Sequence, residues 1–209
     1  MALTELDLPE PRSLRGRWAA LAAVQAAGGR GDGCRADGSS WHYGDGDGRW
    51  CGLHHLGDGR AVLLGHDYDT SQTFYAEASD FFEEQETDLL AGAPDWWAPP
   101  VRRAREEESF LGFVYAFDGS TWRRAEYDVE DGFSSVRLPA LSDGRTREMI
   151  VATVQHHADP GGHEPSQESV DALIAADGAP DAALVAAVIP HAGWDATAGV
   201  AAARAFLTG

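Results

Sequence analysis

The sequence has no lysine and no asparagine, and only 2 of its 209 residues are cysteine. Arginine therefore supplies all 16 basic side chains, against 34 aspartates and glutamates, and the formal net charge is -18. Proteins bind nucleic acids mainly through lysine and arginine contacts with phosphates, so we expect no direct DNA or RNA binding. The same charge favours a partner with a basic surface, although solubility alone is a sufficient reason for it.

Long hydrophobic runs are also missing. The most apolar stretch, from Asp181 to Ile189, is far shorter than the ~20 residues that a membrane-spanning helix needs. Residues 1–13 are acidic and lack the apolar centre of a secretory signal. Without an export signal, Cys34 and Cys51 are expected to remain reduced thiols. We therefore expect a cytoplasmic protein that does not contact membranes.

An N-terminal helix is the first element that the hydrophobic pattern predicts. Apolar side chains recur at helical spacing at Leu14, Trp18, Leu21 and Val24. Ser13 is suited to the N-cap position, and the glycines at 28 and 29 end the helix. Residues 28–40 are rich in glycine and contain no large apolar residue, so this segment is predicted to be a flexible connection.

The middle of the sequence has the pattern of short strands. Gly-Asp turns, which permit tight reversals, separate the three runs Trp41–Tyr43, Arg49–Leu56 and Arg60–His66. This pattern predicts a three-stranded antiparallel meander. Within it, the run Ala61–Leu64 is apolar on both faces and is predicted to be a central strand that is covered on both sides.

More elements are predicted after the meander. A helix is expected over Ser79–Leu90, with Ser79 as its cap. The segment Pro94–Pro100 holds too many prolines for regular structure and is predicted to be a loop. A second hairpin follows, with strands over Phe110–Phe117 and Thr121–Val129, and Phe133–Leu138 is predicted to be a further strand.

Alanine and aliphatic residues dominate the C-terminal region. Helices are predicted over Thr146–His157, Ser166–Ala176, Asp181–Ile189 and Trp194–Leu207. The first of these also suits a strand, because residues 149–154 are mostly β-branched or apolar. Strands in the middle with helices on both sides indicate an α+β fold. We expect a central, mainly antiparallel sheet of about five to seven strands, one N-terminal helix and a helical C-terminal region. Residues 1–209 are expected to form one domain, in which residues 141–209 could be a helical subregion packed on the sheet.

The most concentrated polar cluster lies where the meander ends. His66 and Asp67 form a His-Asp doublet similar to that of HD-type phosphohydrolases, so a metal-dependent hydrolase that uses both is one alternative function. A zinc site, however, needs three or four ligands, often at short spacing, and no such motif is present. His54 and His55 lie at the far end of the predicted hairpin from His66. We therefore predict no metal and no cofactor, and we nominate no catalytic residue.

Four residues are candidates for contact with a partner: Trp96, Trp97, Asp67 and Asp69. Adjacent tryptophans between prolines are difficult to bury together in one core, and tryptophan is enriched at interface hot spots. The alternative is that one tryptophan fills the core while the other lies along the prolines. For the two aspartates, the alternative is hydrogen bonding to backbone amides where the strand ends.

A family resemblance accompanies this cluster. The stretch from Asp45–Gly48 through Leu53 and Val62 to His66–Asp67 is a glycine-bearing turn followed by strands that end near His-Asp. It resembles the strand core of SMI1/KNR4-type immunity proteins over less than a fifth of the chain. No residue role and no activity are transferred from it.

These observations lead to one expected function and two alternatives. We expect a non-enzymatic acidic protein, of an immunity or regulatory kind, that binds a protein with a basic surface. The first alternative is the metal-dependent hydrolase described above. The second is a small-ligand-binding domain whose pocket is lined by Trp41, Tyr43 and Trp50, although these aromatic residues also suit the core of a sheet. The sequence does not predict an oligomeric state.

Overall fold

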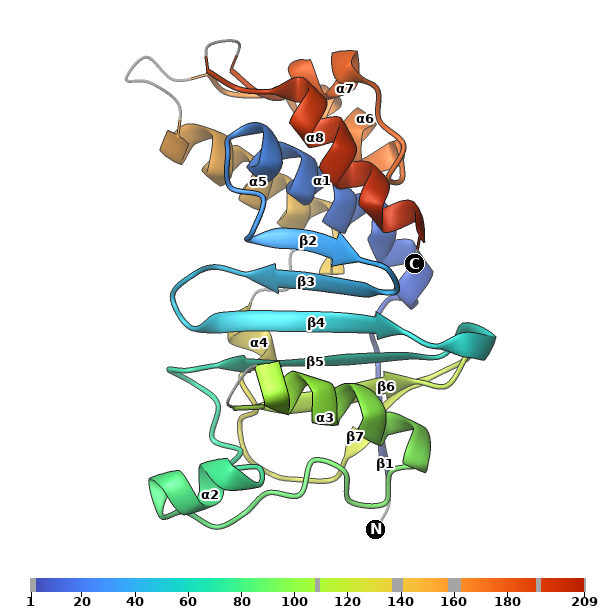
Figure 1. The fold of residues 1–209 in the computed structure, drawn as a ribbon, viewed down its shortest axis with the longest axis vertical. Helices are drawn as coiled ribbons and strands as arrows, with labels where there is room; N and C mark the ends of the chain where they lie inside the picture. The colour runs from blue at the N-terminus through green and yellow to red at the C-terminus, as the bar shows by residue number, and fades with distance from the viewer. Residues whose placement is uncertain (1–2, 108–109, 137–140, 158–162, 191–192, 209) are drawn as a thin grey trace. The chain divides into compact units, whose positions relative to one another are not determined.

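The computed structural model describes residues 3–107, 110–136, 141–157, 163–190 and 193–208 (Figure 1). It contains a seven-stranded sheet with the strand order β1-β7-β6-β5-β4-β3-β2. The strands are Leu3–Leu6 (β1), Cys34–Asp37 (β2), Ser40–Gly44 (β3), Arg49–His55 (β4), Ala61–Asp67 (β5), Phe113–Phe117 (β6) and Trp122–Ala125 (β7). Strand β5 pairs with β4 and β6, and β7 pairs with β6 and β1, all antiparallel. The predicted α+β fold with a mainly antiparallel sheet is confirmed.

One helix precedes β2, two lie between β5 and β6, and the other described helices follow β7 in the chain. The helices are Arg15–Ala27 (α1), Glu77–Phe82 (α2), Ala98–Glu107 (α3), Phe133–Val136 (α4), Asp143–His157 (α5), Gln167–Ala175 (α6), Ala182–Ala186 (α7) and Ala196–Arg204 (α8). The predicted N-terminal helix and helical C-terminal region are thus confirmed, and α5 is a helix throughout, not a strand. Among the described residues, no helix combines the length and apolar character that crossing a membrane requires.

The chain divides into two compact units. The first, called the sheet unit below, comprises Met1–Leu8 and Tyr43–Leu138, and the second, the helical unit, comprises Pro9–His42 and Pro139–Gly209. The C-terminal helices therefore share a unit with α1. The expectation of one domain over the whole chain stays a prediction.

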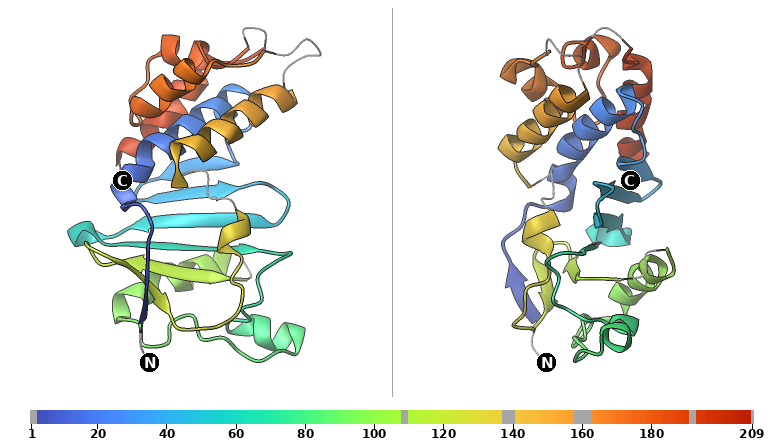
Figure 2. Two further views of the ribbon diagram at one scale, coloured as in Figure 1. Left: turned by 180° about the vertical axis from the view of Figure 1, so that it is seen from behind. Right: turned by 90° about the vertical axis from the view of Figure 1, so that its left-hand side faces the viewer.

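Strand β5 is the centre of the sheet unit. Residues 61–64 have no exposed surface, which confirms the prediction of a strand covered on both sides. Val62 and Leu64 belong to a core cluster that also includes Val101 and Ala104 of α3. Helix α4 contacts β5 as well, and Figure 2 shows α3 and α4 on opposite sides of these strands. Burial of both faces of β5 therefore contributes hydrophobic stabilisation to this unit.

The helical unit is built around α1. Helix α1 packs against α8, α5 and α6, and Trp18 is fully buried in this unit. The Trp18 ring centroid lies 5.9 Å from that of Trp41 and 6.5 Å from that of Phe206. Gly199 permits a close approach of α8 to α1, because a Cβ atom at this position would lie 2.7 Å from the carbonyl oxygen of Ala23.

Several helix predictions need correction. The Pro94–Pro100 segment is not an irregular loop but forms a 3-10 turn over Asp95–Trp97 followed by α3, which starts at Ala98. Prolines in the first turn of a helix are tolerated because the amides of that turn have no intrahelical acceptor. The helix predicted over Ser79–Leu90 is instead the short α2, Glu77–Phe82. It ends because the next residue, Glu83, adopts the left-handed conformation.

The remaining corrections concern strands and the first helix cap. Residues 133–136 form helix α4, not the predicted strand, and the rest of Phe133–Leu138 lies outside the described residues. Strands β1 and β2 were not predicted, since each has only 4 residues and no alternating apolar pattern. Ser13 does not cap α1, because its hydroxyl donates to the carbonyl oxygen of Glu10 in the preceding 3-10 turn.

Candidate interaction surface

Asp67 is a structural residue at the end of β5. Its side chain has no exposed surface, and its Oδ1 accepts hydrogen bonds from the backbone amides of Asp69 (2.8 Å) and Thr70 (3.2 Å). Its Oδ2 accepts from the Ser135 hydroxyl and from Arg49 Nε at 3.0 Å. Burial by itself raises the pKa of Asp67, but the bonds from Ser135, the Asp69 amide and Arg49 outweigh it and hold the pKa below its ordinary value. The carboxylate is therefore ionised and fully occupied.

Asp69 is the solvent-exposed member of the hydrogen-bond network that Asp67 forms with Arg49. Arg49 Nη2 donates to Asp69 Oδ2 at 2.8 Å, and Arg49 Nη1 donates to Asp45 Oδ2 at 3.3 Å. Arg49 therefore ties three carboxylates together across β4 and β5. The predicted hydrogen bonding to local amides is confirmed for Asp67. Asp69 remains 64% exposed in its side chain, so it is accessible to a partner whereas Asp67 is not.

The structure does not bring His66 and Asp67 together into one site. They are successive strand residues, so their side chains point to opposite faces of the sheet. His66 is half-buried with its ring centroid 6.1 Å from that of Phe110, its Nδ1 has no hydrogen-bond partner among the described residues, and burial lowers its pKa. Strand register pairs His66 with Trp50, which places His54 and His55 at the other end of the hairpin, as predicted. In the described part of the chain, no three His, Cys, Asp or Glu side chains are placed to hold a metal ion.

The two candidate tryptophans have different environments. Trp97 is 2% exposed and lies in the core cluster of the sheet unit with Leu89 and Val101. Trp96 is half-buried, and the Arg60 guanidinium carbon lies 5.4 Å from its ring centroid. The structure thus matches the alternative in which one of the two tryptophans, Trp97, fills the core. In this conformation only Trp96 could contact a partner.

The aromatic residues proposed for a ligand pocket are largely core residues. Trp41 is 2% and Tyr43 is 6% exposed. Trp50 is partly buried against the core cluster of the sheet unit. Their placement agrees with the alternative in which they pack within the fold.

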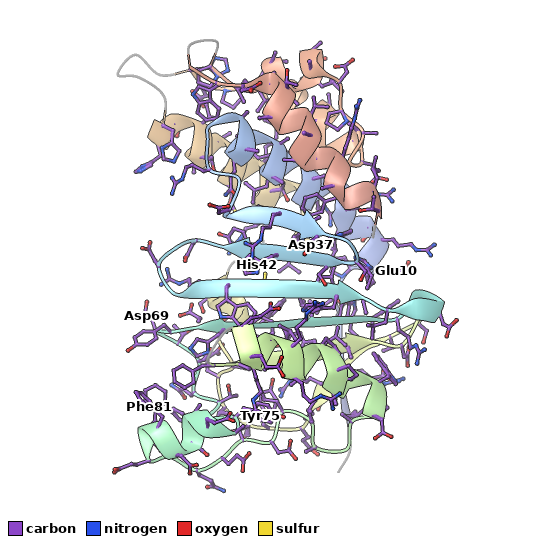
Figure 3. All side chains as sticks on the ribbon, in the orientation of Figure 1. Glu10, Asp37, His42, Asp69, Tyr75 and Phe81 are labelled. Carbon is purple, nitrogen blue, oxygen red and sulfur yellow. The ribbon has the colours of Figure 1, made fainter. Side chains whose placement is uncertain are left out.

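A surface that the sequence analysis did not single out lies around α2. The ring centroids of Phe81 and Phe82 are 4.9 Å apart, and both rings contact Phe110, at 5.6 Å and 5.4 Å. Phe74 lies 5.6 Å from Phe82. The inner rings of this cluster are half-buried, but Phe81 is 70% and Phe82 is 40% exposed. Figure 3 shows Phe81 on α2, in the same segment as Tyr75.

Acidic residues flank the two exposed phenylalanines in the sequence. Residues 77–88 contain six aspartates and glutamates and no basic residue. Glu77 is paired with Arg105, but Asp80, Glu83 and Glu84 make no ion pair with any residue that the structure describes. We call Phe81, Phe82 and these three unpaired acidic residues the α2 surface. It combines two exposed aromatic rings with acidic residues that are adjacent in the sequence.

The backbone on both sides of α2 is strained. Ala76 precedes the helix with φ 53° and ψ -122°, and Glu83 follows it with φ 57° and ψ 38°. Non-glycine residues at positive φ cost about 1–3 kcal/mol each, and such strain is concentrated at functional sites. Helix α2 is therefore bounded on both sides by residues at positive φ.

The sequence carries a signal for this surface, namely two adjacent phenylalanines followed by glutamates. A helix over Ser79–Leu90, as predicted, would place Phe82 on a face that packs against the core. The exposure of Phe82 was therefore not predicted. Comparison with known proteins adds no relative: no family model, no curated protein and no solved structure matches this chain.

Proposed function

We propose that this chain is a non-enzymatic protein-binding protein and that the α2 surface binds a protein segment with both basic and apolar side chains. The observation that carries the proposal is the exposure of Phe81 and Phe82, at 70% and 40%, next in sequence to carboxylates that make no ion pair with a residue the structure describes. Burial of a large aromatic side chain lowers the free energy of the protein in water. Contiguous exposed apolar groups with a polar rim are typical of interaction sites. Aromatic anchors of this kind dominate the binding energy of interfaces.

Charge complementarity indicates the kind of partner. The chain has a net charge of -18, and the acidic residues of the α2 surface have no internal counter-ion among the described residues. A basic segment would be attracted over long range and would then neutralise these carboxylates at close range. Because exposed charges are screened by salt, binding should weaken as ionic strength rises. An immunity or regulatory protein of the cytoplasm, without nucleic-acid contacts, is consistent with this mode of binding.

The hydrolase alternative has less support. The two residues that it needs, His66 and Asp67, point to opposite faces of β5, and the Asp67 carboxylate is saturated by four hydrogen bonds. Neither residue is part of the α2 surface. These two observations favour the binding proposal over the hydrolase alternative.

A selection from a displayed random peptide library tests the proposal. The wild-type chain should enrich peptides that combine arginine or lysine with aromatic or aliphatic residues. The double variant Phe81→Ser, Phe82→Ser should weaken binding of the selected peptides by about 10- to 300-fold. Full burial of a phenylalanine contributes about 1.5–3 kcal/mol, and only the exposed 70% and 40% of the two rings remain to be buried by a partner.

The matched control is Val129→Ser, which changes another exposed apolar residue of the sheet unit, 42% exposed, outside the α2 surface. This variant should bind the selected peptides like wild type. The proposal fails if no peptide is enriched, or if the enriched peptides bind the double variant as tightly as the wild-type chain.

A further inference from the structure

We infer that the α2 surface selects arginine over lysine in its partner. The inference rests on the proposed function above and names the side chain that the surface recognises. It comes from the way in which this chain holds its own arginines.

Arg105 shows how a guanidinium is bound next to α2. Its Nη2 donates to Glu77 Oε2, and its guanidinium carbon lies 5.5 Å from the centroid of the Tyr75 ring. One planar group is thus paired with a carboxylate while it stacks on an aromatic face. Arginine can make both contacts at once because its guanidinium is flat and weakly hydrated, whereas the lysine ammonium is compact and strongly hydrated.

The same arrangement recurs elsewhere in the sheet unit. Arg60 lies over the Trp96 ring and donates to Asp58 Oδ2 at 3.1 Å. Arg124 lies 4.0 Å from the centroid of the Tyr127 ring and donates to backbone carbonyl oxygens. Stacking of a guanidinium on an aromatic ring beside an oxygen acceptor is therefore a repeated contact in this unit.

The α2 surface offers the same two components without an arginine of its own. Phe81 is 70% exposed, and the neighbouring Asp80 and Glu84 have no ion-pair partner among the described residues. An arginine from a partner could stack on a phenylalanine face and pair with a carboxylate, as Arg105 does with Tyr75 and Glu77. A lysine at the same place would make the ion pair but would lose most of the stacking.

Two synthetic peptides of equal length and charge test the inference. One has the sequence Gly-Arg-Leu-Arg-Gly-Arg-Leu-Arg-Gly, and the other has lysine at every arginine position. Affinities are measured by titration calorimetry for the wild-type chain, for the Phe81→Ser, Phe82→Ser double variant and for Val129→Ser, at low and at high salt. Circular dichroism confirms that each variant is folded.

The arginine peptide should bind the wild-type chain and Val129→Ser about fivefold or more tightly than the lysine peptide, at both salt concentrations. In the double variant this preference should fall below about twofold, because only the carboxylates remain. A second variant, Glu84→Gln, should weaken both peptides while it keeps the preference for arginine, since it removes charge but not stacking.

Each outcome has one meaning. Equal affinity of the two peptides, lost in the double variant, overturns the arginine preference and leaves the proposed function standing. An arginine preference that persists in the double variant overturns its assignment to this surface. Binding of neither peptide overturns the inference, and the peptide selection described above then decides whether the proposed function fails with it.

Discussion

Replacement of Asp67 by asparagine should destabilise the chain strongly, although the two side chains have the same shape. Asp67→Asn can still accept the amides of Asp69 and Thr70 through its remaining oxygen. Its new amide group, however, would face Arg49 Nε and the Ser135 hydroxyl, which donate to Oδ2 in the wild-type chain. Arg49 Nε would then face a donor in a site without exposed surface, whereas the Ser135 hydroxyl can turn to donate to the Gly132 carbonyl oxygen.

The expected loss is about 3 kcal/mol in the free energy of unfolding. Hydrogen bonds to charged groups contribute about 1.5–3 kcal/mol, and breaking a buried ion pair by removing one charge costs about 3–5 kcal/mol. Arg49 is partly exposed and keeps Asp45 and Asp69 as partners, which places the estimate at the lower end. The matched control Asp69→Asn removes a carboxylate that is 64% exposed and should cost less than about 1 kcal/mol.

The difference between wild type and Asp67→Asn should depend on pH. Because the pKa of Asp67 is lowered in the folded chain, its contribution is fully present above the unfolded value of ~3.9 and is lost as pH falls through the folded pKa. Urea denaturation followed by circular dichroism at pH 7 and at pH 3 measures both effects. If Asp67→Asn were as mild as Asp69→Asn at pH 7, the structural role of Asp67 would be refuted.

Three further predictions follow from packing and backbone geometry. Gly199→Ala should lower the free energy of unfolding by about 1–3 kcal/mol, because its Cβ would lie 2.7 Å from the Ala23 carbonyl oxygen. Thermal melting measures this loss, and an unchanged melting temperature would contradict the close packing of α8 on α1. Ala76→Gly should stabilise the chain by about 1 kcal/mol in urea denaturation, because glycine adopts φ 53° without strain, and a loss of stability would refute the strained backbone. Trp97→Ala should cost about 3–5 kcal/mol while Trp96→Ala costs clearly less, and equal losses in denaturant titrations would contradict their different burial.

Much of the fold follows from local patterns in the sequence. The glycine-rich turns and the apolar run Ala61–Leu64 were enough to predict the meander and its central strand, because strand period and turn chemistry are local properties. The C-terminal helices were predictable for the same reason, and Ser166, Asp181 and Asp195 cap three of them.

Other features depend on contacts between distant residues. Strand β1 is defined by its pairing with β7, which brings Leu3 opposite Ala125, and a run of 4 residues has no period of its own. The length of α2 is limited by the left-handed residue Glu83, which no capping motif indicates. Since the exposure of the two phenylalanines depends on that limit, the α2 surface could not be predicted from helical periodicity.

Hydrogen–deuterium exchange of the chain, with and without a peptide recovered from the library selection, tests the central claim most directly. Binding at the α2 surface predicts slower exchange in residues 74–88, with little change around Asp95–Trp97 or in β3. Protection that is confined to other segments, with residues 74–88 exchanging as in the free chain, would contradict the claim that this surface binds the partner.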